Sequence, residues 1–414
     1  MTARKRAPSE GTLEPQLKSL EKPTATNSTT DLSRIAPSKA AHILKLSLIF
    51  FLPYFYLILS HYNIDADLKR SIVINAVLSS VGFFVTLTMI PVASRYVLRR
   101  NLFGYDINKK GTPQGSVKVP ESLGIVVGIV FLVFAILFQY FNFTSDSNWL
   151  VEYNAALASI CFMILLGFVD DVLDVPWRVK LVLPSIAALP LLMAYAGHTT
   201  IIIPKPLIHY LGLEVLDLGW MYKLYMWLLA IFCTNSINIH AGLNGLEVGQ
   251  TIVIACAILI HNAMQIGVSS DPEYKQAHAF SIYLVQPLLA TSLALFSYNW
   301  NPSSVFVGDT YTYFAGMTMA VAGILACWVY SLSTASLAKV RPSDGTPYWD
   351  KRWDACELVL KTIWQDVGKV ALHPSTHLPG HLLRLLFLAE VVPDWLVQMR
   401  QQIERKNLMV VIIR

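Results

Sequence analysis

Residues 153–174 read YNAALASICFMILLGFVDDVLD, an apolar run that ends in three carboxylates within five positions. No Asp, Glu, Lys or Arg interrupts residues 153–169. A helix that crosses the ~30 Å hydrocarbon core of a bilayer needs about 20 mostly apolar residues, so this run predicts a membrane helix. Carboxylates at the end of such a helix are unfavourable unless a cation or water meets them. The end of this helix is therefore a candidate functional position.

Similar apolar runs recur along the chain and predict an all-α fold, a polytopic transmembrane helical bundle. Composition agrees with this class, because 54% of the 414 residues are hydrophobic and only 14% are charged, against about 25% in a soluble domain. The high apolar content excludes a disordered chain, and the odd count of five cysteines excludes a disulfide scaffold. The nine predicted spans are residues 43–60, 71–91, 123–141, 153–169, 181–197, 220–239, 249–267, 278–297 and 313–332.

The predicted organisation has four parts. Residues 1–42 predict a disordered cytosolic tail, because they are polar and carry seven Lys or Arg against four acids, and positive residues favour the cytosolic side. Residues 43–60 predict an N-terminal membrane helix; a signal peptide is the alternative, but signal peptides lie nearer the start of a chain. Residues 71–332 form the membrane domain, and residues 333–414 form a divergent tail whose pattern predicts no definite fold.

Counting membrane crossings from a cytosolic N-terminus assigns each loop to one side. Loop 142–152 falls on the lumenal side, has no Lys or Arg, and contains the sequon Asn142-Phe143-Thr144, a candidate glycosylation site. Four loops fall on the cytosolic side, and the first of them is rich in basic residues, in agreement with the positive-inside rule. These cytosolic loops are residues 92–122, 170–180, 240–248 and 298–312.

The second cytosolic loop carries the densest group of charges. Asp171 and Asp174 are three positions apart, so on a helix they share a face, whereas Asp170 points elsewhere. Arg178 and Lys180 follow them. A solvated helix cap is the alternative, but carboxylates that are followed so closely by cations favour a site for a metal and a phosphate.

The third loop continues an apolar helix with three amides, a histidine and two glycines, at residues 234–247. Amides supply neutral oxygens for a hard cation and donors for a nucleotide base, and glycines let the backbone approach a ligand closely. Hydrogen bonding between helices by buried Asn is the alternative. The first loop, at residues 103–109 and 120–122, is by itself typical of an ordinary basic loop. In the fourth loop, Asp309 either caps a helix or binds a metal.

Together these loops bring carboxylates, amides and a lysine to one face of the membrane. Mg²⁺ prefers oxygen ligands and is completed by substrate phosphates, so the set predicts Mg²⁺-dependent phosphoryl chemistry at the cytosolic surface. The sequence has no P-loop motif, no Cys/His cluster for zinc and no Gly-x-Ser-x-Gly elbow of a lipase or esterase. A transporter is the alternative from another class, but it would place polar residues near helix centres and not at helix ends.

At this point the motifs resemble those of the polyprenyl-phosphate hexosamine-phosphate transferases. The resemblance is to the tunicamycin-sensitive eukaryotic members, which make the first lipid-linked intermediate of N-glycosylation. It covers about residues 71 to 326. The resembling stretches are residues 103–109, 120–122, 167–180, 189–193, 231–250 and 305–325.

The resemblance implies a role for each matching residue. It implies that Asn238 and Asp309 hold Mg²⁺, and that Asp170, Asp171 and Lys180 are catalytic. It also implies substrate contacts in three places. The first cytosolic loop would contact the nucleotide sugar, and the end of the 220–239 span would contact the lipid phosphate. A residue just beyond that span would contact uracil. These predicted substrate-binding residues are Tyr105, Asp106, Ile107, Glu121, Ile231, Phe232, Cys233, Thr234, Asn235, Ser236, Ile237, Ile239 and Asn244.

The implied reaction is transfer of GlcNAc-1-phosphate from UDP-GlcNAc to dolichyl phosphate, which releases UMP. The resemblance also implies a multi-pass protein of the endoplasmic reticulum membrane, with its active site facing the cytosol. A homodimer is implied in the same way, whereas no nucleic-acid partner is expected.

The resemblance stops near residue 325. Members of the family continue with a further helix and a Pro-Cys-Pro-Arg-His-Arg loop that grips the pyrophosphate, and residues 326–414 contain no Arg-His-Arg. Eleven Lys or Arg follow residue 332 on the side that parity makes lumenal, against the positive-inside rule. This pattern favours a retained intron, a frameshift or an alternative last exon, and a tail specific to this lineage is the alternative. Two alternatives to the main reading remain open as well, an inactive truncated or mis-spliced member and a related polyprenyl-phosphate sugar-phosphate transferase of the peptidoglycan type.

Overall fold

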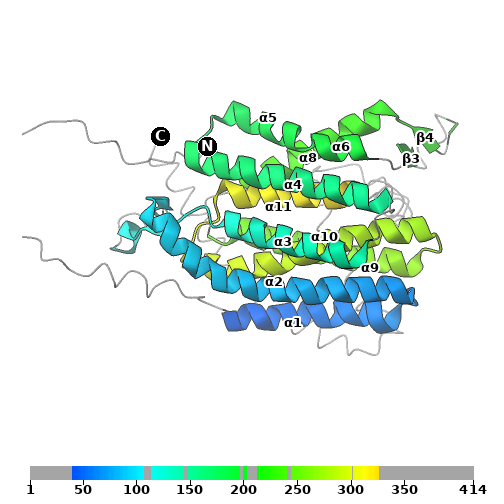
Figure 1. Cartoon of the computed structure of the whole chain (residues 1–414), viewed down its shortest axis with the longest axis horizontal. Helices are drawn as coiled ribbons and strands as arrows, with labels where there is room; N and C mark the ends of the chain where they lie inside the picture. The colour runs from blue at the N-terminus through cyan, green and yellow to red at the C-terminus, as the bar shows by residue number, and fades with distance from the viewer. Residues whose placement is uncertain are drawn as a thin grey trace, which may run out of the picture.

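The computed structural model describes residues 40–106, 113–143, 148–195, 199–202, 212–213, 215–239, 244–300 and 302–325. Within these ranges the chain is mostly helical, and its long helices run side by side along one axis (Figure 1). Five of the described helices are long and apolar enough to cross a membrane. They are α2 (Ala66–Arg99), α3 (Gly124–Asn142), α4 (Asn148–Leu173), α9 (Leu246–Val268) and α10 (Pro272–Asn299). The predicted helical membrane bundle is thereby confirmed in class, and the count of nine spans stays a prediction.

The other described helices are shorter or less apolar. They are α1 (Ala40–Tyr56), which continues into a π-helical turn at Leu57–His61, α5 (Trp177–Ala187), α6 (Leu189–Ala194), α8 (Trp220–Ile239), α11 (Gly308–Leu325) and a 3₁₀ turn at Pro113–Ser116. The predicted span 181–197 is divided between α5 and α6. Pro190 lies in the first turn of α6 and has no N–H to continue α5, so the helix restarts there. Residues 1–39, the predicted tail 333–414 and the end of the last predicted span lie outside the described residues.

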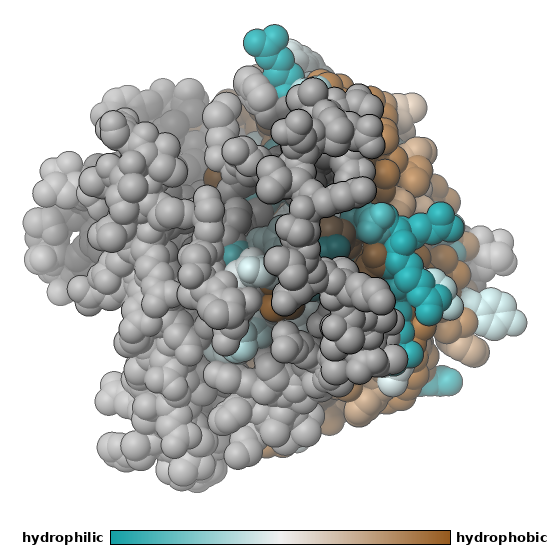
Figure 2. All heavy atoms as spheres, turned by 90° about the vertical axis from the view of Figure 1, so that its left-hand side faces the viewer, coloured by the Kyte–Doolittle hydropathy of each residue, from teal (hydrophilic) through white to brown (hydrophobic). Residues whose placement is uncertain are grey.

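Helices α10 and α11 occupy the centre of the bundle. The apolar part of α10 is buried along its whole length, and α10 packs against α2, α3, α9 and α11. Helix α11 in turn packs against α4 and α8. Large apolar side chains such as Phe84, Ile129 and Leu228 point outward, as expected for a surface that faces lipid. Figure 2 shows hydrophobic side chains along the flank and hydrophilic ones nearer the viewed end of the bundle.

Two short hairpins depart from the predicted all-α fold. Strand β1 (Phe103–Gly104) pairs antiparallel with β2 (Val119–Pro120), so that Phe103 lies opposite Pro120. Strand β3 (Thr200–Ile202) pairs with β4 (Val215–Asp217) near the other end of the bundle (Figure 1). Such short strands escape a pattern-based reading, because two or three residues show no periodicity.

The first hairpin is extended by a third segment from far along the chain. Residues 305–307 lie beside β2, and Phe306 N donates to Pro120 O at 2.8 Å. Gly124 N donates to Val307 O at 3.0 Å, which ties the start of α3 to the same segment. The first and fourth predicted cytosolic loops therefore form one small platform at the end of the bundle.

Candidate active site

The polar motifs meet where α4 and α8 end and α11 begins. Asp170 lies in the last turn of α4, Asn238 in the last turn of α8, and Asp309 in the first turn of α11, while Lys180 lies in the first turn of α5. The apolar parts of α4 and α8 both pack on α11, which brings their polar ends together. Three of the four predicted cytosolic loops thus contribute to one cluster.

Lys180 is the centre of this cluster. Its Nζ lies 2.8 Å from Asp170 Oδ2 and 2.8 Å from Asp309 Oδ2. The Asp170 side chain is fully buried, whereas Lys180 and Asp309 keep 22% and 13% of their side-chain surface exposed. Burial of the ammonium lowers the pKa of Lys180, but the charges of Asp309 and Asp170 and their hydrogen bonds to it raise that pKa by more. The net result is a raised pKa. Lys180 is therefore a cation at neutral pH, and it holds two carboxylates whose oxygens converge on one point.

Tyr313 belongs to the cluster, although the sequence analysis did not single it out. Its hydroxyl donates to Asp170 Oδ2 at 3.1 Å, and the Asn238 side chain is a further hydrogen-bond partner of this hydroxyl. The spacing held a signal, because Tyr313 follows Asp309 by four positions and so lies on the same face of α11. Tyr313 links the end of α4 to the end of α8.

Asp171 has a different task from Asp170. Its carboxylate accepts hydrogen bonds from Asp309 N at 2.6 Å, from Thr310 N at 3.2 Å and from the Thr310 hydroxyl. A carboxylate that meets the first N–H groups of a helix satisfies otherwise unpaired donors and complements the helix dipole. In this structure Asp171 therefore holds the start of α11 and with it Asp309. Its predicted catalytic role stays a prediction.

The predicted helix face shared by Asp171 and Asp174 is wrong. Helix α4 ends at Leu173, and Asp174 is exposed with a left-handed φ of 53°. Asp171 and Asp174 therefore do not share a helix face. Asp170, which was expected to point elsewhere, is the residue that contacts Lys180. Helix α4 ends one residue before Asp174, so the rule that residues three apart on a helix share a face does not apply to Asp171 and Asp174.

Two glycines allow the close approach of α11 to its neighbours. Gly308 has a φ of 74°, and a Cβ placed on it would overlap the Asp171 carboxylate and lie 2.8 Å from Ser122 Cα. A Cβ on Gly167 of α4 would lie 2.7 Å from Thr310 Cα. Larger residues at either position would push the start of α11 away from the carboxylates of α4.

A second polar contact joins the first and third predicted loops. Asn244 Nδ2 donates to Asp106 Oδ2 at 3.0 Å, and Asp106 is buried. Tyr105 is half exposed, and its ring lies edge-on to Phe103 at 5.7 Å. Glu121 N donates to Leu102 O, which places Glu121 on the same platform. The structure thus brings four of these predicted substrate-binding residues to one end of the bundle, while Ile107 lies outside the described residues.

The predicted lipid-contact residues of α8 differ in exposure and fall into three groups. Phe232 and Ile239 are exposed on the flank of the bundle, whereas Thr234 and Ile237 are buried. The polar members bond back to their own helix, and Asn235 Nδ2, for example, donates to Ile231 O at 2.9 Å. The remaining residues are of intermediate exposure: Ile231, Cys233, Asn235, Ser236 and Asn238. A lipid contact therefore fits the exposed pair best, and the assignment stays a prediction.

The donor set fits the predicted magnesium ion. Among the described residues no group of three or more His, Cys, Asp or Glu side chains forms a metal centre by itself. Asp309 and Asn238 supply a carboxylate and an amide oxygen, the oxygen ligands that Mg²⁺ prefers, and substrate phosphates commonly complete such a site. The carboxylates of Asp170 and Asp309 already converge on one cation, the Lys180 ammonium. The Mg²⁺ ligands remain a prediction that this chemistry supports.

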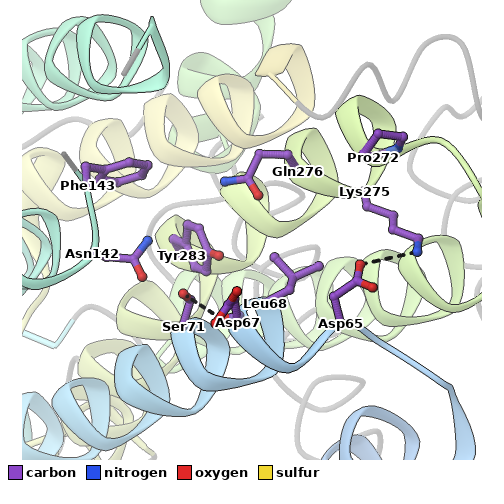
Figure 3. Close-up of a pocket in the computed structure, with 10 residues that line it drawn as sticks. All are labelled: Asp65, Asp67, Leu68, Ser71, Asn142, Phe143, Pro272, Lys275, Gln276 and Tyr283. Carbon is purple, nitrogen blue, oxygen red and sulfur yellow. Dashed lines mark hydrogen bonds and ion pairs between the residues drawn. The ribbon is translucent and has the colours of Figure 1, made fainter. Parts of the chain in front are cut away.

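A cavity of about 360 Å³, lined mainly by polar residues, lies at the other end of the bundle, where α2 and α10 begin and α3 ends. Figure 3 shows its lining, in which Lys275 Nζ lies 3.4 Å from Asp65 Oδ2. Asn142 of the predicted sequon points into it, and glycosylation there stays a prediction, because Thr144 lies outside the described residues. The lining residues are Asp65, Asp67, Leu68, Ser71, Asn142, Phe143, Pro272, Lys275, Gln276 and Tyr283.

Comparison with known proteins identifies the class. Residues 153–327, which hold the charged cluster, match the model of glycosyl transferase family 4. The chain is also 33% identical over 342 residues to a relative from Leishmania amazonensis, of which it covers 73%. The chain therefore belongs to glycosyl transferase family 4, and the resemblance inferred from the motifs is confirmed.

Within this class the chain is similar to proteins of one name, UDP-N-acetylglucosamine–dolichyl-phosphate N-acetylglucosaminephosphotransferase. The Leishmania relative carries it, over 61% of this chain. A relative from Dictyostelium discoideum is 52% identical over 269 residues, which is 59% of this chain and 66% of the relative. A relative from Schizosaccharomyces pombe is 38% identical over 278 residues, which is 61% of each chain. The chain thus spans less than two thirds of the length of the latter two.

Proposed function

We propose that the chain transfers GlcNAc-1-phosphate from UDP-GlcNAc to dolichyl phosphate and releases UMP. The observation that carries the proposal is the 52% identity to the Dictyostelium relative, whose name states this pair of substrates. The site supports it, because the matched region contains two carboxylates, one of them fully buried, held by Lys180 at the end of an apolar bundle. A lipid phosphate and a nucleotide sugar would meet at such an end.

The reaction needs charge neutralisation more than it needs a strong base. The second pKa of a phosphate monoester is about 6, so the lipid phosphate is already anionic at neutral pH. One of its oxygens forms a bond to the sugar-side phosphorus, and the bond from that phosphorus to the bridging oxygen breaks, so that UMP leaves. Lys180 is a cation beside Asp309, where it would bind the pyrophosphate and stabilise the charge that develops on it.

The remaining residues would hold the substrates in place. Asn244 and Asp106 form the polar contact that would bind the nucleotide, and Asp171 keeps Asp309 at the start of α11. Asp309 and Asn238 would hold Mg²⁺, which when bound supplies further neutralisation of the pyrophosphate. Phe232 and Ile239 lie exposed near the same end and would contact the polyprenyl chain.

We propose the same cellular setting as the sequence predicted. The chain would cross the endoplasmic reticulum membrane nine times, with the cluster facing the cytosol. The basic character of loop 92–122 supports this orientation under the positive-inside rule. A homodimer is part of the proposal by resemblance to the family.

The test is a transferase assay on membranes that contain the full chain. UDP-GlcNAc, dolichyl phosphate and Mg²⁺ should give lipid-linked GlcNAc, and tunicamycin should block its formation. Asp309→Ala should abolish the product, while Asp174→Ala, at an exposed position outside the cluster, should retain it. A folded wild-type chain that forms no product would refute the activity and favour the inactive alternative. Product formed only from a muramoyl-pentapeptide nucleotide would favour a transferase of the peptidoglycan type.

A further inference from the structure

Asn299, the last residue of α10, uses both ends of its side-chain amide. Its Oδ1 accepts a hydrogen bond from Gly245 N at 3.0 Å, and its Nδ2 donates to Val305 O at 2.9 Å. The residue is 2% exposed, so water does not replace either contact. A buried amide with both partners satisfied fixes the two backbone segments relative to each other.

The two segments belong to different parts of the candidate active site. Gly245 is the neighbour of Asn244 and has a left-handed φ of 81°. Val305 begins the segment that runs along β2 and ends at Gly308 and Asp309. Asn299 therefore joins the turn that carries Asn244 to the segment 305–308, which leads into Asp309.

These contacts close a ring around the platform. Asn244 bonds to Asp106, which follows β1, and β1 pairs with β2. Strand β2 bonds to Phe306, and the segment that contains Phe306 bonds through Asn299 back to Gly245. Hydrogen bonds join the segments of this ring, and the contacts Asn244–Asp106 and Gly245–Asn299 span 138 and 54 residues of sequence. The ring is broken if Asn299 is lost, because no other described side chain bonds to both Gly245 N and Val305 O.

We propose that Asn299 is a positioning residue that sets the separation between the nucleotide end of the site, at Asn244, and the phosphate end, at Asp309. The inference rests on the proposed function, since it takes a nucleotide diphosphate sugar as the ligand that spans both ends. A ligand that contacts both ends gains from a fixed separation, whereas a ligand that contacts one end gains little. Asn299 touches no substrate in this account.

The test compares two ligands on purified full-length protein in the presence of Mg²⁺. Affinities for UDP-GlcNAc, which spans both ends, and for UMP, which lacks the sugar-side phosphate, are measured by calorimetry. Asn299→Ala should weaken the affinity for UDP-GlcNAc about tenfold, equivalent to one lost buried hydrogen bond. The loss of affinity for UMP should be several-fold smaller. Asn299→Asp keeps the acceptor for Gly245 N but loses the donor to Val305 O. Its affinity for UDP-GlcNAc should therefore lie between those of the wild type and of Asn299→Ala.

Ser297→Ala is the matched control. Ser297 is also buried in α10, but its hydroxyl donates only to Ala294 O of the same helix, at 2.7 Å. It should leave both affinities unchanged. Hydrogen exchange supplies a readout without any ligand, because the Gly245 amide should exchange faster in Asn299→Ala and not in Ser297→Ala.

The outcomes separate the two proposals. If wild-type protein binds neither ligand, the proposed function fails and the inference fails with it. If wild type binds UDP-GlcNAc and Asn299→Ala binds it equally well, the positioning role alone is refuted. An equal loss for both ligands, with a lowered unfolding temperature, would assign Asn299 a purely structural role and also refute the inference.

Discussion

The two ends of the bundle carry the same kind of ion pair in different surroundings. At one end Lys180 lies 2.8 Å from each of two carboxylates, one of which is fully buried. At the other end Lys275 lies 3.4 Å from Asp65, whose side chain is 69% exposed and lines an open polar cavity. An exposed pair contributes about 0–1 kcal/mol, whereas removal of one partner from a buried pair costs about 3–5 kcal/mol. The exposure of the carboxylates therefore distinguishes the two ends, and the loss of a cation should cost far more at Lys180 than at Lys275.

The largest effect is expected from Lys180→Met, which leaves Asp170 and Asp309 facing each other without a cation. The free energy of unfolding should fall by about 3–5 kcal/mol, and transferase activity by about 10²–10³-fold. Thermal unfolding in detergent and the product assay measure the two changes. A variant with wild-type stability would show that the two ends do not differ in the way described.

Gly308→Ala should come next, because it tests the fit of α11 against α4 without changing any charge. A Cβ at a φ of 74° is strained and overlaps Asp171, so about 1–3 kcal/mol of stability should be lost. Activity should fall with it, because Asp309 moves. Gly323→Ala in the same helix is the control, since no atom lies within 4 Å of its added Cβ. Equal unfolding temperatures for the two variants would contradict the tight fit.

Asp171→Asn should have a smaller effect than either. The amide can still accept one backbone N–H at the start of α11, but it carries no charge to complement the helix dipole. A loss of about 1–2 kcal/mol is expected, measured by thermal unfolding, with a lowered kcat. Asp174→Asn, at an exposed position, is the control and should match wild type. If Asp171→Asn left both stability and kcat intact, the cap would have no role in holding Asp309.

Lys275→Met should have the smallest effect, because it breaks the exposed pair at the opposite end. The expected loss of stability is about 0–1 kcal/mol, and the product assay should show wild-type turnover. Raising the salt concentration should shrink even this loss, since exposed charges are screened. A loss as large as that of Lys180→Met would reverse the comparison between the two ends.

The helices and their polar ends could be predicted because both depend on local sequence. The apolar run 153–169 lies within α4, and the aspartates after it lie in its last turn or just beyond its end. The break between α5 and α6 follows from Pro190, a local cause that a hydropathy window averages away. The short hairpins carry no periodic signal, so a reading of patterns could not find them.

The roles of individual side chains were less predictable. Adjacent aspartates have the same chemistry on paper, but Asp170 contacts Lys180 while Asp171 caps α11. Tyr313 is marked only by its spacing of four positions from Asp309, and Asn299 lies in no motif. Their importance comes from partners that are 143 and 54 residues away along the chain. Only packing selects such partners.

The sequence by itself determined that this chain is a helical membrane protein, that its polar residues gather at helix ends, and that those motifs belong to one transferase family. These properties follow from hydropathy and from the order of residues, which act over one or two helical turns. The tertiary structure alone decided which ends meet, which carboxylate faces Lys180 and which amide joins Gly245 to Val305. The physical reason is that a hydrogen bond or ion pair depends on distances of about 3 Å, and only the packing of α4, α8 and α10 on α11 sets those distances.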